Sequence, residues 1–248
     1  MKEKIRKAIK RIQVASHIAD RHGEKMVVCF SGGKDSQVTL DLVQRAGVPF
    51  RAVYSVTTID HPLNVNFIRK NYPIVEFVHP ELNFWQLIEK KKMLPSIWKR
   101  FCCAYLKECY GGYVRALGVR REESSARQSY AVINSNRHGY RFMPIIDWKE
   151  WEVWEYIEQH NLPVNPCYDF GHRVGCMICP YAPARQIKER FDEYPNLRRL
   201  MLRAIRKIRE NPESSFGNDF PHATDEQVLS WWVNKDKKFL QPELDFDL

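Results

Sequence analysis

The feature that most constrains the fold is a glycine-containing hexapeptide between a short apolar segment and an amphipathic one. Residues 26–30 form a continuous apolar run, which is typical of a strand buried on both faces of a sheet. The hexapeptide follows directly and reads Ser31-Gly32-Gly33-Lys34-Asp35-Ser36. Residues 37–46 then carry apolar side chains at helical spacing. A strand, a tight turn and a helix in this order predict an anion-binding corner, because the first N–H groups of the helix point at the turn.

Strand-like and helix-like segments continue to alternate along the chain. Helices are predicted over residues 2–22, 62–71, 84–91 and 148–160, and strands over 51–56, 74–78, 116–120 and 142–146. From residue 182 the pattern is helical, over 182–194, 195–211 and 225–234. Alternation of this kind favours a parallel sheet with right-handed crossovers. We therefore expect an open, mainly parallel α/β domain over residues 1–165, followed by a small helical, cysteine-bearing part over residues 166–248.

Charge and hydropathy narrow the class of ligand and the compartment. The 248 residues include 39 Lys and Arg against 30 Asp and Glu, a net charge of +9. This excess favours anionic ligands such as nucleotides or nucleic acid, although a solvated basic surface would look the same. No apolar run reaches the roughly 18 residues of a membrane span, and the basic N-terminus lacks the apolar core of a signal peptide. We expect a cytoplasmic protein without a membrane partner; an oligomer is compatible with the sequence.

The side chains of the hexapeptide suit a phosphate ligand. Lys34 can supply a positive charge, and the hydroxyls of Ser31 and Ser36 can donate hydrogen bonds. The loop is not a Walker A motif, because Val28 stands where that motif needs its first glycine and Asp35 stands where it needs Ser or Thr. The alternative is a glycine-rich turn that binds nothing.

Seven cysteines, without an export signal, favour metal or redox chemistry over disulfides. Cys102 and Cys103 are adjacent, and Cys176 and Cys179 form a Cys-x-x-Cys pair far along the chain. Four thiolates that converge can hold zinc or an iron–sulfur cluster. Adjacent cysteines fit one zinc ion poorly and suit a larger [4Fe–4S] cluster, so the cluster is preferred and zinc remains the alternative. The remaining cysteines, at positions 29, 109 and 167, are read as packed thiols, with sulfur handling as a second reading for Cys167.

These motifs resemble those of known families. The loop resembles the SGGxDS loop of the N-type ATP pyrophosphatases, which implies that residues 31–36 bind ATP and that Lys34 and Asp35 act in catalysis. The Cys-Cys-x-x-x-Lys pattern ending at Lys107, with the distant Cys-x-x-Cys pair, resembles the adenosine phosphosulfate reductases. That resemblance implies Cys102, Cys103, Cys176 and Cys179 as ligands of a [4Fe–4S] cluster.

Residues 118–127 resemble the anion-site element of proteins similar to phosphoadenosine phosphosulfate (PAPS) reductase. The matching positions are Arg120, Ser124 and Arg127, and the resemblance implies that both arginines contact the nucleotide and act in catalysis. An i,i+4 charge ladder on a solvated helix is the alternative. Residues 162–169 also resemble this family, so the matched segments reach from about residue 26 to about residue 185, and the implied fold is that of the adenine nucleotide alpha hydrolases.

Two departures from the reductases shape the expected function. The second predicted strand is followed by Thr57-Thr58-Ile59-Asp60-His61-Pro62 instead of the reductase loop. Asp60 and His61 could contact substrate there, and capping of the next helix is the alternative for Asp60. No cysteine follows Cys179, whereas reductases use one near their C-terminus. The preferred hypothesis is an ATP-dependent adenylating sulfur transferase with a cysteine desulfurase or thiol reductant as partner and a nucleic acid as one candidate acceptor. The alternatives are a sulfonucleotide reductase and a non-catalytic nucleotide-binding module with structural zinc.

A basic stripe on the predicted helix over residues 195–211 bears on the acceptor. Its cations are Arg198, Arg199, Arg203, Arg206, Lys207 and Arg209. Such a stripe can follow a phosphate backbone, and a solvated helix face would have the same composition.

Overall fold

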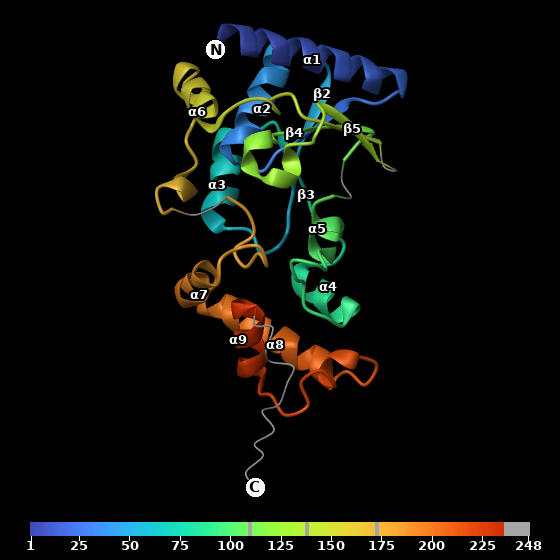
Figure 1. The fold of residues 1–248 in the computed structure, drawn as a ribbon, viewed down its shortest axis with the longest axis vertical. Helices are drawn as coiled ribbons and strands as arrows, with labels where there is room; N and C mark the ends of the chain where they lie inside the picture. Colours follow the sequence, from blue (N-terminus) through green and yellow to red (C-terminus); the bar gives the residue numbers. More distant parts are fainter. Residues whose placement is uncertain (109–110, 137–138, 172–173, 236–248) are drawn as a thin grey trace. The chain divides into compact units, whose positions relative to one another are not determined.

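The computed structural model describes residues 1–108, 111–136, 139–171 and 174–235. The contacts between segments divide it into two compact units (Figure 1). Unit 1 consists of residues 1–56, 60–79 and 107–175, and unit 2 of residues 57–59, 80–106 and those from 176 onward. The expected boundary between residues 165 and 166 stays a prediction. None of the helices in the described ranges has both the length and the apolar character needed to cross a bilayer.

Unit 1 contains a six-stranded sheet in the order β3-β2-β1-β4-β6-β5 among the residues described. All neighbouring strands are parallel except β5 and β6, which form an antiparallel pair. The strands are β1 (Met26–Cys29), β2 (Phe50–Ser55), β3 (Val75–Val78), β4 (Val114–Leu117), β5 (Ile133–Asn136) and β6 (Gly139–Phe142). The predicted open, mainly parallel sheet with flanking helices is therefore confirmed.

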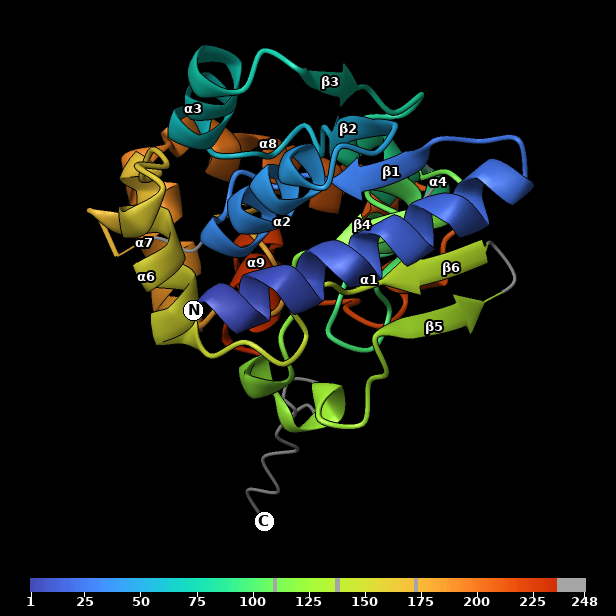
Figure 2. The same cartoon turned by 90° about the horizontal axis from the view of Figure 1, so that it is seen from above.

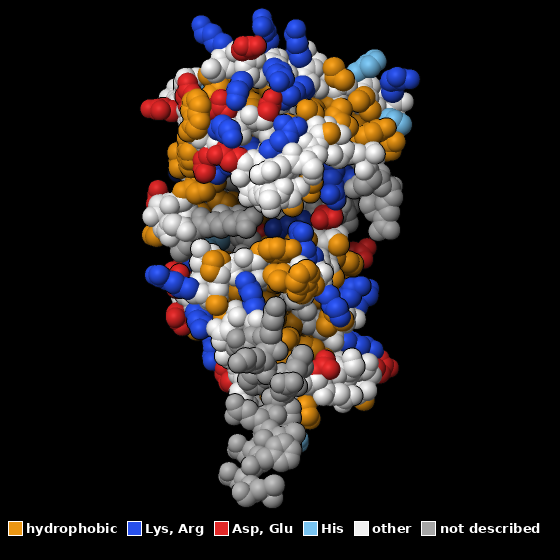
Figure 3. All heavy atoms as spheres, viewed as in Figure 1, with side chains coloured by type: hydrophobic (Ala, Val, Ile, Leu, Met, Phe, Trp, Pro, Cys, Tyr) orange, Lys and Arg blue, Asp and Glu red, His pale blue; other side chains and the backbone are white. Residues whose placement is uncertain are grey.

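The helices of unit 1 bury apolar stripes against this sheet. They are α1 (Lys2–Arg21), α2 (Lys34–Arg45), α3 (Pro62–Asn71) and α6 (Glu150–Gln159). In α1, Ala8, Ile12, Ala15 and Ala19 recur at helical spacing and are all fully buried. Figure 2 shows α1 and α2 over the same face of the sheet. The opposite side of α1 is basic, and Figure 3 shows Lys and Arg side chains along its outer surface.

Unit 2 is helical and has its own apolar core. Its helices are α4 (Phe84–Lys91), α5 (Phe101–Leu106), α7 (Ala184–Glu193), α8 (Pro195–Glu210) and α9 (Asp225–Asn234). Leu87 of α4, Met201 and Ile205 of α8, and Trp232 of α9 share one buried cluster. The short helix α5 begins at Phe101, so it includes the adjacent cysteines and does not follow them, and it belongs to this unit.

The basic stripe of α8 is largely neutralised by carboxylates. Four of its six cations form ion pairs: Arg198 with Glu226, Arg206 and Arg209 with Asp225, and Lys207 with Glu89. Exposed pairs of this kind contribute little to stability, but they reduce the charge that the helix offers to a phosphate backbone. The structure therefore favours the alternative interpretation, in which the stripe is a solvated helix face.

The later strands differ from the sequence-based expectation. The predicted strand over 142–146 lies instead at Gly139–Phe142, because Pro144, two residues after Phe142, cannot donate a ladder hydrogen bond. The edge strand β5 is not predicted, because its sequence Ile-Asn-Ser-Asn lacks the apolar alternation of a half-buried strand. The predicted strand over 116–120 begins earlier and ends at Leu117.

Asp147 ties α1 to the segment that precedes α6. Arg11 Nη1 and Nη2 lie 2.8 Å and 3.1 Å from its two carboxylate oxygens, and Lys7 Nζ lies 3.0 Å from one of them. Burial alone would raise the pKa of Asp147, but the hydrogen bonds from Arg11 and Lys7 outweigh it and lower that pKa from 3.8 to about 2. A folded-state pKa below the unfolded value stabilises the fold above pH 3.8 and loses that contribution as the pH falls toward 2.

We therefore expect the stability gap between the wild-type protein and Asp147→Asn to close at low pH. After discounting for solvent screening, the gap should shrink by on the order of 1 kcal/mol between about pH 6 and about pH 2.5. Urea unfolding of both proteins at the two pH values measures it, with the exposed Asp20→Asn as the matched control. A gap that stays constant over this range would show that Asp147 is not held by these cations.

Candidate functional site

The hexapeptide lies at the point where the order of the strands in the sheet reverses. The chain leaves β1 toward β2 on one side, and β4 lies on the other side of β1. In open parallel sheets, ligands bind outside the carboxyl ends of the strands at such a switch point. Residues 31–36 follow β1 and residues 118–120 follow β4, so both segments singled out in the sequence lie at this end of the sheet.

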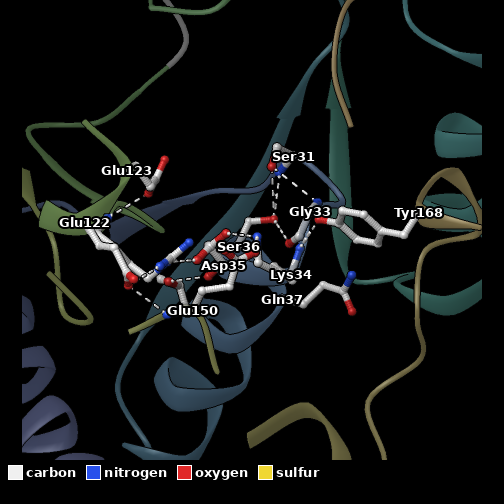
Figure 4. Close-up of polar contacts among 12 residues, drawn as sticks. Ser31, Gly33, Lys34, Asp35, Ser36, Gln37, Glu122, Glu123, Glu150 and Tyr168 are labelled. Atoms are coloured by element: carbon white, nitrogen blue, oxygen red, sulfur yellow. Dashed lines mark hydrogen bonds and ion pairs between the residues drawn. The ribbon is translucent and has the colours of Figure 1, made fainter. Parts of the chain in front are cut away.

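The two glycines of the loop have different roles. Gly32 has a φ of +79°, and a Cβ there would lie 2.2 Å from Asn64 Oδ1, so this position requires glycine. Gly33 has an ordinary φ of −81° and caps α2, and a Cβ there would meet Ser31 Oγ at 3.4 Å. Ser36 closes the loop, because its hydroxyl accepts from the Ser31 N–H at 3.2 Å and donates to the Gly33 carbonyl at 2.8 Å (Figure 4).

Buried amide side chains hold the loop backbone in place. Asn165 donates to the Gly32 carbonyl at 2.9 Å, and Gln37 donates to the same oxygen at 3.0 Å. Asn64 of α3 donates to the Ser31 carbonyl at 3.1 Å. None of these three side chains was predicted as a site residue. Asn165 lies in the segment over residues 162–169 that resembles the reductase family, and that resemblance could have pointed to it. Gln37 and Asn64 lie within helices, where an amide side chain gives no sign of such a role.

Five charged side chains form a network at the start of α2. The buried Arg120 places Nε against Asp35 and Nη1 3.2 Å from Glu122. Lys34 Nζ lies 3.4 Å from Asp35 and 3.2 Å from Glu150. Burial opposes the charge on Lys34, but Asp35, then Tyr168 and Glu150, outweigh it and raise the pKa of Lys34. Lys34 therefore stays charged, and Arg120 orients Asp35 at the loop.

The other two residues of the predicted anion element are arranged differently. Arg127 pairs with Glu123, and Glu123 also accepts from the Arg120 N–H at 2.8 Å. Ser124 is exposed in extended backbone between two short 3-10 turns. Within the described part of the chain, no hydrogen bond or ion pair joins Arg127 to the loop. Nucleotide contacts by Ser124 and Arg127 therefore stay predictions.

The Tyr168 side chain accepts a hydrogen bond from one of the backbone N–H groups that an anion at the loop would use. The Lys34 N–H in the first turn of α2 donates to the Tyr168 hydroxyl at 2.9 Å (Figure 4). The Lys34 ammonium lies 5.9 Å from the centres of the Tyr168 and Trp154 rings. A phosphate that takes up this N–H must displace the Tyr168 hydroxyl, so the side chain competes with the ligand.

We expect Tyr168→Phe to bind ATP more tightly than the wild-type protein. The hydroxyl that competes for the Lys34 N–H is lost, and the ring that packs against Trp154 is kept. One competing hydrogen bond corresponds to about 1 kcal/mol, or roughly a fivefold lower Kd. Titration calorimetry measures the change. Tyr72→Phe, which removes a hydroxyl that donates to Gln37 at 2.8 Å, is the matched control. Weaker binding by Tyr168→Phe would show that this hydroxyl contacts the nucleotide instead.

The four predicted metal ligands all belong to unit 2. Cys102 and Cys103 begin α5, and Cys176 and Cys179 lie in the segment before α7. The Cys102 side chain is hydrogen-bonded to Cys103, which together with burial and the charges of Cys103 and Cys176 raises the pKa of Cys102. Cys176 Sγ also lies 3.4 Å from Thr57 Oγ1. The fold thus brings the sulfurs of Cys103 and Cys176 within electrostatic reach of Cys102.

Over the described ranges, no group of three or more His, Cys, Asp or Glu side chains is already arranged around a metal-ion position. The four residues nevertheless fit an iron–sulfur cluster by their chemistry, since all are cysteines and all belong to unit 2. Binding of the metal would release the thiol protons, because iron is bound by the thiolate. The assignment of these ligands stays a prediction.

The remaining predicted residues are placed as follows. Cys167 is fully buried, and its N–H donates to Asn165 Oδ1 at 3.0 Å, which fits a packed thiol. Burial raises the pKa of Cys29 to about 11, so this thiol stays neutral at the end of β1. Cys109 lies outside the described residues. The cap of α3 is His61 and not Asp60, because His61 Nδ1 accepts from the Leu63 N–H at 3.2 Å.

Comparison with known proteins gives consistent matches. The chain is 29% identical over 175 residues to the adenosine 5'-phosphosulfate reductase of Staphylococcus haemolyticus, covering 64% of this chain and 71% of that protein. It is also 29% identical over 183 residues to an uncharacterized protein of Methanocaldococcus jannaschii, of which the match spans only 44%. Among solved structures, the PAPS reductase of Candida auris in its phosphate complex matches with a TM-score of 0.48 and 18% identity, over 66% of this chain and 87% of that one.

A family model carries the assignment. The phosphoadenosine phosphosulfate reductase domain matches residues 25–182, a range that includes the loop after β1, the segment after β4 and all four predicted cluster cysteines. This match extends over more than half of the chain. The chain therefore belongs to the phosphoadenosine phosphosulfate reductase family.

Proposed function

We propose that this protein binds ATP at residues 31–36 and adenylates an acceptor, with release of pyrophosphate, as the first step of a sulfur transfer. The observation that carries the proposal is the complete SGGxDS loop at the switch point of the sheet, fixed by Ser36 and by the buried Asn165. A loop of this geometry presents helix N–H groups to a polyphosphate.

The chemistry assigned to the chain's own residues follows from the charge network. Lys34 places a positive charge at the loop, where it can balance the growing charge on the leaving pyrophosphate. Arg120 fixes Asp35 in the first turn of α2, so that the loop keeps one shape while a ligand binds. An acceptor oxygen then attacks the α-phosphorus, the bond to the bridging oxygen breaks, and pyrophosphate leaves with both electrons of that bond.

A [4Fe–4S] cluster is the proposed cofactor, held by Cys102, Cys103, Cys176 and Cys179. When bound, it would supply sulfur-handling or redox chemistry to the second half of the reaction. The supporting observations are that all four cysteines lie in unit 2 and that Cys103 and Cys176 both lie close enough to Cys102 to raise its pKa. A cysteine desulfurase or a thiol reductant is the proposed source of sulfur or electrons, and a nucleic acid is one proposed acceptor.

Iron content tests the cofactor. Protein purified without oxygen should contain about four irons and four sulfides per chain. Cys102→Ser and Cys176→Ser should each lose most of this iron, whereas Cys29→Ser, the matched control in unit 1, should keep it. Zinc without iron or sulfide in the wild-type protein would reject the cluster in favour of a structural zinc.

Product analysis tests the reaction. With ATP and a pool of candidate acceptors, the proposal predicts one pyrophosphate for each acceptor that becomes adenylated. AMP should be released only when a sulfur donor is added and sulfur displaces it from the adenylated acceptor. ADP and orthophosphate would show a different chemistry at the same loop.

The second candidate is a sulfonucleotide reductase, which is favoured by relatives named adenosine 5'-phosphosulfate reductase at 27–29% identity. Sulfite release from adenosine phosphosulfate with a thiol reductant, without any need for ATP, would establish it. Cys167 is buried, so a Cys167→Ser variant should leave such an activity unchanged unless that thiol is brought to the substrate. If neither reaction occurs and zinc is present, the non-catalytic nucleotide-binding module remains.

A further inference from the structure

An exposed tryptophan stands out on unit 2. Trp98 is 87% exposed, the highest value among the exposed large hydrophobic residues. Its loop is nonetheless fixed, because Ser96 Oγ accepts from the N–H groups of Trp98 and Lys99 at 3.3 Å and 3.0 Å, and the Ser96 N–H donates to the Lys99 carbonyl at 3.2 Å. A large aromatic ring held in water on an ordered turn requires a functional explanation.

A second exposed aromatic residue is attached to the same turn. Tyr181 is 49% exposed, and its hydroxyl donates to the carbonyl of Ile97, the residue before Trp98, at 3.0 Å. The Arg100 guanidinium lies 5.0 Å from the centre of the Tyr181 ring. Lys235 donates to the carbonyl of Ala182 at 2.7 Å, which brings another cation close to Tyr181. We call Trp98, Lys99, Arg100, Tyr181 and Lys235 the aromatic–basic surface.

The segments that carry this surface are rich in Lys and Arg. Residues 90–107 include six Lys or Arg and no Asp or Glu, and residues 176–188 include Arg185 and Lys188 and no Asp or Glu. Some of these cations are paired elsewhere, as Lys92 is with Glu213. Lys99 and Arg100 are exposed beside Trp98. The charge of the surface is therefore suited to an anionic partner.

We propose that the aromatic–basic surface binds single-stranded nucleic acid by stacking bases on Trp98 and Tyr181 while the cations contact the backbone. Exposed rings flanked by Lys and Arg are the combination that holds unpaired bases without reading their sequence. A duplex keeps its bases stacked on one another, so it gains nothing from these rings. The α8 stripe is less suited, since most of its cations are neutralised.

This inference rests on the proposed function in one respect: the bound strand would be the acceptor of the sulfur. Trp98, Lys99 and Arg100 come just before Cys102 in the sequence, and Tyr181 comes two residues after Cys179. A nucleic-acid strand bound to this surface would therefore lie along the cysteine-bearing segments of unit 2.

Fluorescence anisotropy with labelled 12-nucleotide single strands of DNA and RNA tests the surface. Trp98→Ala and Tyr181→Ala should each weaken binding about tenfold, and Trp98→Phe should weaken it less. The Lys99→Ala/Arg100→Ala variant should weaken binding and lower its dependence on salt between about 50 and about 200 mM NaCl. Binding should also quench tryptophan emission in the wild-type protein, and most of that quenching should be lost in Trp98→Ala.

Trp151→Ala is the matched control. Trp151 is 63% exposed but stands between Glu150 and Glu152, so its removal should leave binding unchanged. The proposal is overturned if single strands do not bind, if Trp98→Ala binds them as the wild-type protein does, or if a duplex binds more tightly. All of these assays omit ATP. A failure to bind single strands therefore says nothing against the ATP reaction, and a failure of the ATP reaction says nothing against this binding.

Discussion

Gly118→Ala is expected to abolish ATP binding and to destabilise unit 1. A Cβ at this position would lie 2.5 Å from the backbone carbon and oxygen of Asp35 and 2.7 Å from the Ser36 nitrogen. Backbone atoms cannot move aside as a flexible side chain can, so the first turn of α2 would have to separate from the end of β4. We expect a loss of about 3 kcal/mol in the free energy of unfolding, measured in urea, and an ATP affinity that falls by more than about tenfold.

Gly33→Ala is the matched variant in the loop itself. Its Cβ would make only ordinary contacts, at 3.4 Å from Ser31 Oγ and from the Tyr168 hydroxyl. We therefore expect its unfolding free energy to stay within about 1 kcal/mol of the wild-type value, while ATP binding is lost because the backbone can no longer approach a phosphate closely. If Gly118→Ala binds ATP normally, the end of β4 does not lie against the start of α2.

Arg120→Met is expected to have the second largest effect. The Arg120 side chain is 4% exposed and faces Asp35, whose own side chain is 18% exposed. Methionine fills a similar volume but cannot pair with the Asp35 carboxylate. Removing one partner of such a buried ion pair lowers the free energy of unfolding by about 3–5 kcal/mol. Urea unfolding measures the loss of stability, and calorimetry measures the accompanying loss of ATP affinity.

A second substitution separates the ion pair from simple packing. In Arg120→Met/Asp35→Asn the carboxylate charge is also removed, so we expect much of the stability to return while ATP binding stays weak. Arg121→Ala is the control, because the half-buried Arg121 side chain donates to the Tyr130 carbonyl at the protein surface and should change stability by less than about 1 kcal/mol. A double variant that is no more stable than Arg120→Met would mean that packing, and not charge, determines the effect.

The fold and the position of the site could be predicted from local patterns. The apolar run that became β1, the glycine turn and the helix that followed are neighbours in sequence, so their geometry is set locally. The helices over Pro62–Asn71, Phe84–Lys91 and Asp225–Asn234 have the predicted bounds, because caps and apolar spacing mark their ends.

The partners of the loop could not be predicted, because they come from distant parts of the chain. Asn64 and Asn165 act through carbonyls of residues 31 and 32, which only the folded structure brings within reach. The ion pair of Lys34 with Glu150 could not be predicted either, because it depends on α6 packing beside α2. The hydroxyl of Tyr168 on the Lys34 amide is a further long-range contact of this kind.

The cysteines are an intermediate case. Their spacing indicated two pairs that share a site, and the fold places both pairs in unit 2 even though α5 interrupts the expected order of elements. The sequence could not show that Cys102 and Cys103 start a helix or that Thr57 lies beside Cys176.

Competition at the loop provides the most direct test of the ATP proposal. ATP binding should be measured by calorimetry alone and in the presence of excess pyrophosphate or AMP. If residues 31–36 hold the β- and γ-phosphates, pyrophosphate will displace ATP, AMP at the same concentration will compete far less, and Gly33→Ala will bind neither ATP nor pyrophosphate. AMP that binds as tightly as ATP while pyrophosphate fails to compete would contradict a polyphosphate site at this loop.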